Sequence, residues 1–184
     1  MPSAPPFKPI VFVPSKSEEN IRSFPVHRIL AVAHPPIAEG PGGNHWCLYL
    51  SAGPMRTVRI DPNPSGIPGP TILGGSKANV VISELHEDRP SDAQHVDTLS
   101  VAPGLVVGQF IDAITNAGRH KYEFDETGRG CRMWTRDQVD LFLRLGLTTD
   151  PAEAQKVRED VSVEFAESKP TGVHLPLNRG AYYG

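Results

Sequence analysis

The alternation of large apolar and polar side chains across residues 44–61 predicts a β-hairpin. In the segment NHWCLYL (44–50), successive side chains point to opposite faces of a strand. One face carries the large apolar side chains that a core requires: Trp46, Leu48 and Leu50. The other face carries polar and reactive groups: His45, Cys47 and Tyr49. The segment SAGP (51–54) predicts a turn, and MRTVRID (55–61) predicts the returning strand.

The rest of the chain predicts an α+β fold, a curled antiparallel β-sheet packed with C-terminal helices. Further strands are predicted at 10–13, 26–33, 77–85 and 95–101, and helices at 103–117, 131–145 and 151–165. Residues 62–76 hold four prolines and four glycines, which predicts a long loop that covers a cleft. We expect a single domain at 25–167, preceded by an N-terminal arm (1–24) and followed by a C-terminal tail (168–184) without a clear element.

The hairpin also predicts which polar residues face one another. A turn centred near Gly53 places His45 opposite Asp61, Cys47 opposite Arg59 and Tyr49 opposite Thr57. Cross-strand Cβ atoms lie about 4.5–5.5 Å apart. An aspartate facing a histidine can hold the imidazole in one tautomer and stabilise its protonated form. A register slip of two residues would put Arg59 in the place of Asp61.

Cys131 has the sequence context of an activated nucleophile. It follows Gly128-Arg129-Gly130 and opens a predicted helix. The positive end of a helix and the flanking Arg129 and Arg132 lower a thiol pKa and favour the thiolate. In this interpretation His45 is the base and Asp61 orients it. The alternative is a structural cysteine packed beside Trp134.

Composition narrows the classes of function. The 184 residues include 19 prolines and 17 glycines, which predicts many turns, and the net charge of −3 argues against a strongly basic nucleic-acid binder. No apolar run approaches the roughly 20 residues that span a bilayer, and no signal peptide is visible, so we expect no membrane span and a cytoplasmic protein. Two cysteines and scattered histidines predict neither a disulfide scaffold nor a metal site, and we expect no cofactor.

Several segments resemble known families. The combination of NHWCLYL, TVRID, HKYEF and GRGCRMW resembles a fungal family of unassigned function over roughly residues 25–147. The order of a His-Trp strand and a later helix headed by cysteine resembles the circularly permuted papain-like proteins, the NlpC/P60 and lecithin:retinol acyltransferase-like group. That resemblance implies a papain-like fold with Cys131 as nucleophile. The acyltransferase group usually has asparagine before its cysteine, where this chain has Gly130.

The favoured hypothesis is a cysteine-dependent hydrolase or acyltransferase that acts on an ester, thioester or amide of a small molecule. The residues assigned to substrate binding are Asn44, Tyr49, Arg59, Arg129 and Trp134. One alternative is a cyclase or isomerase of a fungal natural-product pathway (secondary metabolism) that uses the same cleft without a covalent step. Another is a non-catalytic binding module. The apolar segment near residues 8–13 can act as an edge strand and pair with a second copy, which would give a homodimer.

Overall fold

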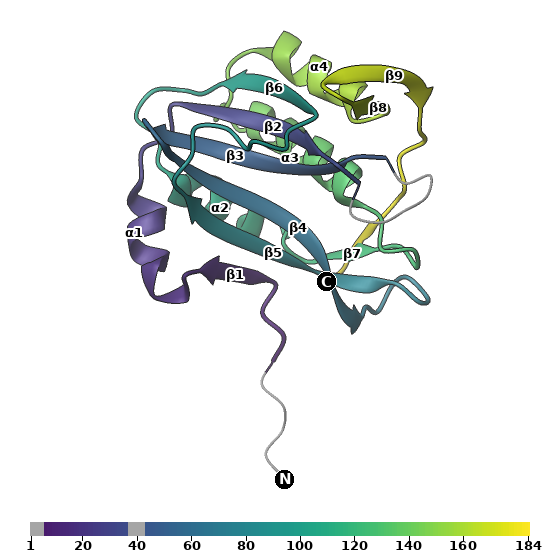
Figure 1. Ribbon diagram of the computed structural model, residues 1–184. Coiled ribbons are helices and arrows are strands. Elements are labelled where there is room, and N and C mark those ends of the chain that lie inside the picture. The colour runs from purple at the N-terminus through teal and green to yellow at the C-terminus, as the bar shows by residue number, and fades with distance from the viewer. Residues whose placement is uncertain (1–5, 37–42) are drawn as a thin grey trace.

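A computed structural model describes residues 6–36 and 43–184, and within these ranges eight strands form one sheet (Figure 1). The strand order is β10-β7-β5-β4-β3-β2-β6, and β1 pairs with β5 beside this path. The strands of this sheet are β1 (Ile10–Val13), β2 (Arg28–His34), β3 (His45–Gly53), β4 (Arg56–Pro68), β5 (Ser76–Leu85), β6 (His95–Ser100), β7 (Tyr122–Phe124) and β10 (Ala181–Tyr182). The pairing is antiparallel except between β1 and β5, so the α+β class with an antiparallel sheet is confirmed.

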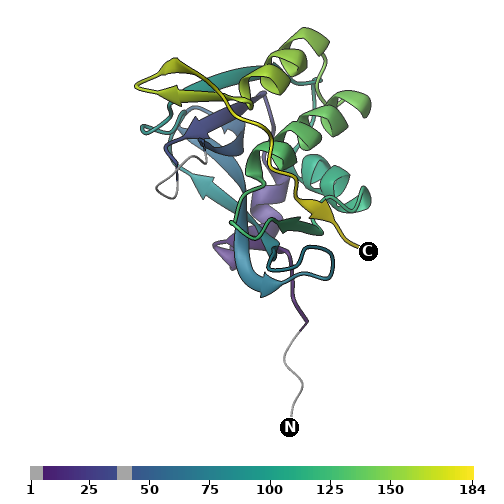
Figure 2. The same ribbon diagram turned by 90° about the vertical axis from the view of Figure 1, so that its right-hand side faces the viewer.

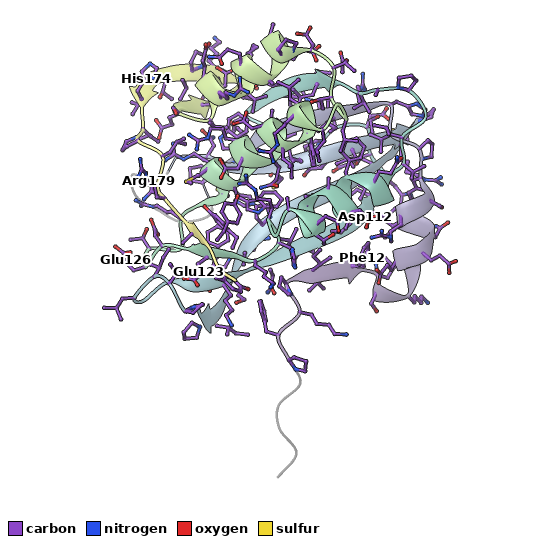
Figure 3. The ribbon with its side chains drawn as sticks, turned by 180° about the vertical axis from the view of Figure 1, so that it is seen from behind. Phe12, Asp112, Glu123, Glu126, His174 and Arg179 are labelled. Carbon is purple, nitrogen blue, oxygen red and sulfur yellow. The ribbon has the colours of Figure 1, made fainter. Side chains whose placement is uncertain are left out.

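Helices cover one face of the sheet (Figure 2). The helical elements are η1 (Ser15–Ser17), α1 (Glu18–Ser23), α2 (Val107–Asn116), α3 (Cys131–Arg144) and α4 (Pro151–Asp160). Seen from behind, α2 and α3 lie across the sheet (Figure 3). The apolar face of β3 packs into this layer with the aromatic residues of both helices. The fully buried members include Trp46, Leu48, Leu50, Phe110, Trp134 and Phe142.

The structure corrects the predicted loop at 62–76. About half of this segment is strand, because β4 continues to Pro68 and β5 begins at Ser76, and the loop is confined to residues 69–75. Pro62 and Pro64 pair with β5, and no pairing with β3 is present at these positions. A proline fits a strand where its nitrogen faces away from a paired neighbour. Pro62 and Pro64 therefore lie in a part of β4 that pairs with β5 alone, and not in a loop.

The hairpin register is also corrected. Tyr49 pairs with Arg59, and Ser51 pairs with Thr57. The predicted register had paired Tyr49 with Thr57. The shift arises because the turn is at Pro54 and Met55, where Met55 has φ +51°, and because the strands are irregular between Ser51 and Gly53. Together, the later turn and the irregularity move the β4 partner of each β3 residue by two positions from the predicted register.

The C-terminal part contains more strand than predicted. Helix α4 ends at Asp160 instead of near Phe165, and the chain turns into the hairpin of β8 (Val163–Ala166) and β9 (Lys169–His174). The short strand β10 then joins the main sheet beside β7. Helix α2 begins at Val107, four residues after Pro103. No helix in the described part of the chain combines the length and apolar character that crossing a bilayer requires.

Candidate active site

The site lies where β3 and β4 separate. Pairing between these strands begins at Leu48 and Ile60, so His45 at the start of β3 has no ladder partner on β4. Strand β4 continues past this point and pairs with β5 from Asp61 to Pro64. The N-terminus of α3 packs behind β3, and the Thr135 hydroxyl donates a hydrogen bond to the Trp46 carbonyl at 3.4 Å. Two strands and a helix end therefore meet at one place.

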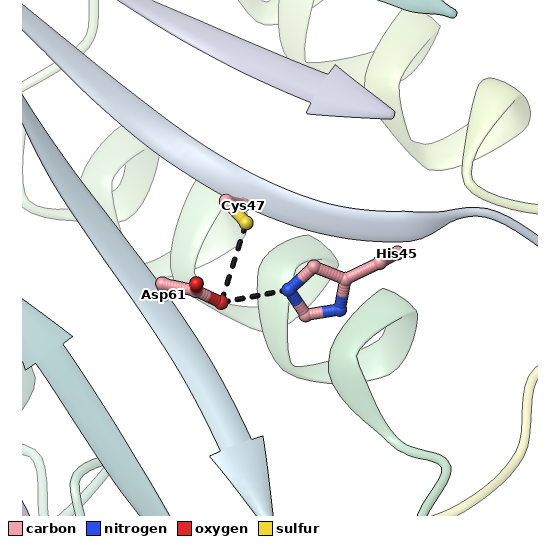
Figure 4. A group of neighbouring side chains, drawn as sticks. All are labelled: His45, Cys47 and Asp61. Atoms are coloured by element: carbon pink, nitrogen blue, oxygen red, sulfur yellow. Dashed lines mark hydrogen bonds and ion pairs between the residues drawn. The ribbon is translucent and has the colours of Figure 1, made fainter. Parts of the chain in front are cut away.

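His45 and Asp61 form a close pair across this gap (Figure 4). The Nε2 atom of His45 lies 2.7 Å from Oδ1 of Asp61, and both side chains are almost wholly buried. The Cys47 thiol donates to the same oxygen at 3.3 Å. In the observed register, Cys47 and Asp61 are the positions that follow the last pair, Leu48 and Ile60. His45 lies two residues before Cys47 on β3, so its ring reaches the Asp61 carboxylate diagonally across the two strands. The predicted pairing of His45 with Asp61 holds for a different geometric reason.

Cys131 adjoins this pair at the first turn of α3. Its side chain is half-buried and lines the same cleft as His45, whose ring lies near enough to act on the pKa of the thiol. Since Nε2 of His45 faces Asp61, Nδ1 is the nitrogen that remains for the thiol. His45 thus contacts Asp61 directly and shares the cleft wall with Cys131, and the catalytic roles of the three residues stay a prediction.

Electrostatics favour charge separation in this triad. Burial alone would raise the pKa of Cys131, but the hydrogen bond and charge of His45 outweigh it and hold the pKa below its ordinary value. Burial likewise opposes the charged forms of His45 and Asp61. Their mutual hydrogen bond prevails, so the pKa of His45 is raised and that of Asp61 falls to about 2. Burial raises the pKa of Cys47 to about 12, so this thiol stays neutral.

A cleft of about 530 Å³ opens beside Cys131. Its walls come from the start of β3, from β4, from the turn before α3 and from the C-terminal segment. The residues that line it are Pro36, Gly43, Asn44, His45, Asn63, Pro64, Thr127, Gly128, Arg129, Gly130, Cys131, Arg132 and Asn178. The segment 62–76 was predicted to cover this cleft as a loop. Instead Asn63 and Pro64 lie in strand β4 and form part of the cleft wall. The glycine-rich segment before Gly43 lies outside the described residues.

The residues predicted to bind substrate divide into two groups. Arg129 and Asn44 line the cleft, but the Asn44 amide is bonded to the backbone of His34 and Phe165. The others are not among the lining residues. Tyr49 and Trp134 are fully buried, and Arg59 lies 3.7 Å from Asp61 through its Nε atom. Arg59 can therefore act on the site through Asp61.

A second polar chain joins Tyr49, which the sequence assigned to substrate binding, to His34 and Asp92, which it did not assign to the site. The hydroxyl of Tyr49 lies 3.0 Å from Nε2 of His34, whose Nδ1 lies 3.0 Å from Asp92. His34 pairs with His45 across β2 and β3, with ring centroids 6.4 Å apart. The position of His34 before Pro35-Pro36 was the available sequence signal. Asn63 and Asn178 were also missed, because no local pattern brings them to the cleft.

Three side chains near the cleft are of the types that bind metal ions, but their spacing fits hydrogen bonds better than a metal site. His45, Cys47 and Asp61 could converge on a cation. Ligand atoms about 2.0 Å from a tetrahedral zinc lie roughly 3.3 Å apart, so the 2.7 Å separation of His45 and Asp61 fits a shared proton better. A second cluster joins His95, Asp97 and Asp160. There the Lys156 ammonium contacts both carboxylates and supplies the positive charge.

The fold and site define an α+β protein in which a cysteine and a histidine line one cleft and an aspartate is bonded to the histidine. Residues 29–183 match the family described as a domain of unknown function, DUF7770, and the chain belongs to this family. The match extends through β10 at the end of the chain. No curated protein and no solved structure matches the chain.

Proposed function

We propose that the protein is a cysteine-dependent hydrolase or acyltransferase that acts on an ester, thioester or amide of a small molecule. The observation that carries the proposal is the buried His45–Asp61 pair beside a cleft whose wall His45 shares with Cys131. A thiolate next to a protonated imidazole, with a carboxylate behind it, is the arrangement that nucleophilic catalysis by cysteine requires. The chain order, with His45 on a strand before Cys131 at the start of a helix, supports a distant relation to permuted papain-like proteins of the NlpC/P60 group. The fungal origin rests on the sequence resemblance alone.

The chemical steps follow from the atoms present. The Cys131 sulfur attacks the carbonyl carbon of the substrate, and the C–S bond forms as the carbonyl oxygen takes the negative charge. Helix α3 begins at Cys131 with no side-chain cap, so backbone N–H groups of its first turn are available to stabilise that oxyanion. When the bond to the leaving group breaks, the protonated His45 gives its proton to the leaving atom. The product is a thioester on Cys131.

The second half-reaction releases the acyl group. Neutral His45 takes a proton from an acceptor, which is water in a hydrolase or an alcohol or amine in an acyltransferase. The acceptor oxygen or nitrogen attacks the thioester carbon, and the sulfur leaves as thiolate. Asp61 keeps the Nε2 proton of His45 in place throughout, so that Nδ1 always faces the sulfur.

The proposal is tested with p-nitrophenyl acetate as an activated acyl donor. The expected result is a burst of p-nitrophenol and a mass increase of one acetyl group, mapped to Cys131 by peptide analysis. Cys131→Ala should remove both signals, and the matched variant Cys47→Ala should keep the burst. Absence of any acetylated cysteine in the wild-type protein would contradict covalent catalysis and favour the non-covalent cyclase or isomerase, or the binding module.

A further inference from the structure

Two arginines lie beside Cys131 in the wall of the cleft. Arg129 precedes the nucleophile by two residues and is half-buried, and Arg132 follows it directly and is almost wholly buried. They lie close enough to affect one another: burial lowers the pKa of Arg132, and the charge of Arg129 adds to this effect. Two guanidinium groups of like charge at one site repel unless a negative group lies near them.

The charge of Arg132 is not neutralised by a carboxylate in the described structure. Its four hydrogen bonds go to neutral oxygens of the C-terminal half: the carbonyls of Val161, Leu175 and Pro176 and the side-chain oxygen of Asn178. These bonds hold the chain that passes along the cleft. They satisfy the donors of Arg132 but leave its positive charge in place.

Arg129 likewise has no ion pair within residues 6–36 and 43–184. Asp125 lies in the same turn, but its oxygens accept bonds from Thr127, from the backbone N–H of Arg129 and from the Asn178 amide. Asp61 is engaged by His45 and Arg59. In the described part of the chain, Asp61 and Asp125 are therefore both committed to partners other than the Arg129 guanidinium.

We propose that the substrate of this cleft is an acyl compound carrying a carboxylate, which the Arg129 guanidinium binds beside the Cys131 sulfur. The inference rests on the proposed thiol chemistry and names its substrate class. Apart from Cys131, His45 and Arg132, the remaining lining residues are uncharged amides, a hydroxyl, prolines and glycines, and none of the lining residues is a carboxylate. A guanidinium matches a carboxylate through paired N–H donors and keeps its charge at every physiological pH.

Two alkylating reagents of similar size separate the inference from the proposed function. Iodoacetate carries a carboxylate and iodoacetamide a neutral amide, and both report on the same thiolate. Rate constants for Cys131 are measured by peptide mass analysis at neutral pH for the wild type, Arg129→Gln and Arg144→Gln. Arg144 is an exposed arginine at the other end of α3 and serves as the matched control. Glutathione gives the reference ratio for a thiol outside a protein.

The wild type should prefer iodoacetate over iodoacetamide by about threefold to tenfold more than glutathione does, as expected for one partly solvated charge interaction. The preference should fall with added salt, fall by at least half in Arg129→Gln, where Arg132 keeps its charge, and persist unchanged in Arg144→Gln. An equal ratio in the wild type and in Arg129→Gln would overturn the anionic substrate while leaving a reactive Cys131. Failure of both reagents to label Cys131 would overturn the proposed function and this inference with it.

Discussion

The imidazole Nε2 of His45 lies 2.7 Å from Oδ1 of Asp61, although the two residues are not directly opposed in the hairpin. The contact is made where β3 and β4 part, so the side chains cross a space that the ladder no longer fills. An opposed pair in a closed ladder would have no room beside it for Cys131. The divergence of the strands thus creates both the pair and the cleft.

Replacing His45 with glutamine should remove the base of the triad. The expected loss in acyl transfer is about 10²- to 10⁴-fold, the usual contribution of a positioned general acid or base. The rate of acetylation of Cys131 by p-nitrophenyl acetate measures it. The contrary result would be an unchanged rate in a folded His45→Gln protein, because Cys131 would then react without help from the ring.

Asp61→Asn should slow acylation by at least about tenfold while leaving Cys131 in place. An asparagine can donate as well as accept, so it no longer fixes the Nε2 proton of His45. The pH–rate profile provides the measurement. Its alkaline limb should move to lower pH, because the carboxylate that raises the pKa of His45 is gone. A profile identical to that of the wild type would show that Asp61 does not act on the ring.

Acid should unfold the wild type partly through Asp61. Its pKa falls from 3.8 to about 2 in the folded protein because the bond and charge of His45 outweigh burial. This depressed pKa contributes roughly 2 kcal/mol of stability above about pH 4, which is lost as the pH falls toward 2. Urea unfolding at pH 7 and at pH 3 for wild type and Asp61→Asn checks this. The stability difference between the two proteins should shrink at the lower pH, and a constant difference would contradict it.

Gly130→Ala should destabilise the turn that presents Cys131. Gly130 has φ +156°, and an added Cβ would lie 3.0 Å from the Tyr122 hydroxyl and 3.2 Å from Phe124. The expected cost is about 1–3 kcal/mol. Gly128→Ala is the matched control, since its φ is +75° but the nearest atom lies 3.9 Å away. Thermal unfolding compares the two, and an equal loss would assign the effect to backbone conformation alone.

Tyr49→Phe should show whether the Tyr49 hydroxyl stabilises the fold or binds substrate. The Tyr49 hydroxyl contacts His34, and the side chain is almost wholly buried, so its loss leaves a buried polar group short of a partner. We expect a stability loss of about 1–3 kcal/mol. Acylation of Cys131 should change less than threefold, because Tyr49 does not line the cleft. A large rise in the substrate concentration needed for half-maximal rate, without a loss of stability, would restore the predicted binding role.

The sequence predicts an element well where the periodic spacing of its apolar residues determines the structure. Alternation at Trp46, Leu48 and Leu50 identified the buried face of β3, and the helical spacing after Gly130 located α3. The proposed triad followed from these two elements, because both place reactive groups at element ends. The class of fold followed from the order of strands and helices.

Other features depend on contacts that no local pattern records. The register of the hairpin is set by a bulge and a two-residue turn, which shift pairing without changing which residues share a face. The strand at Pro62 and Pro64 is not predictable from the local sequence, because a proline cannot donate a hydrogen bond to a neighbouring strand and so usually indicates a loop. Here β4 pairs only with β5 at these positions, so a backbone N–H is not needed on the side of β3. Asn178 reaches the cleft only because Arg132 holds the C-terminal segment.

The central claim is that His45 activates Cys131, and the pH dependence of alkylation tests it most directly. Iodoacetamide labelling of Cys131 should reach half its maximal rate below about pH 8, whereas an unperturbed cysteine titrates near about pH 8.5. His45→Gln should move that midpoint upward, and Cys47 should remain unlabelled because it is buried and neutral. Equal labelling of Cys47 and Cys131, seen at alkaline pH alone and unchanged in His45→Gln, would contradict the claim.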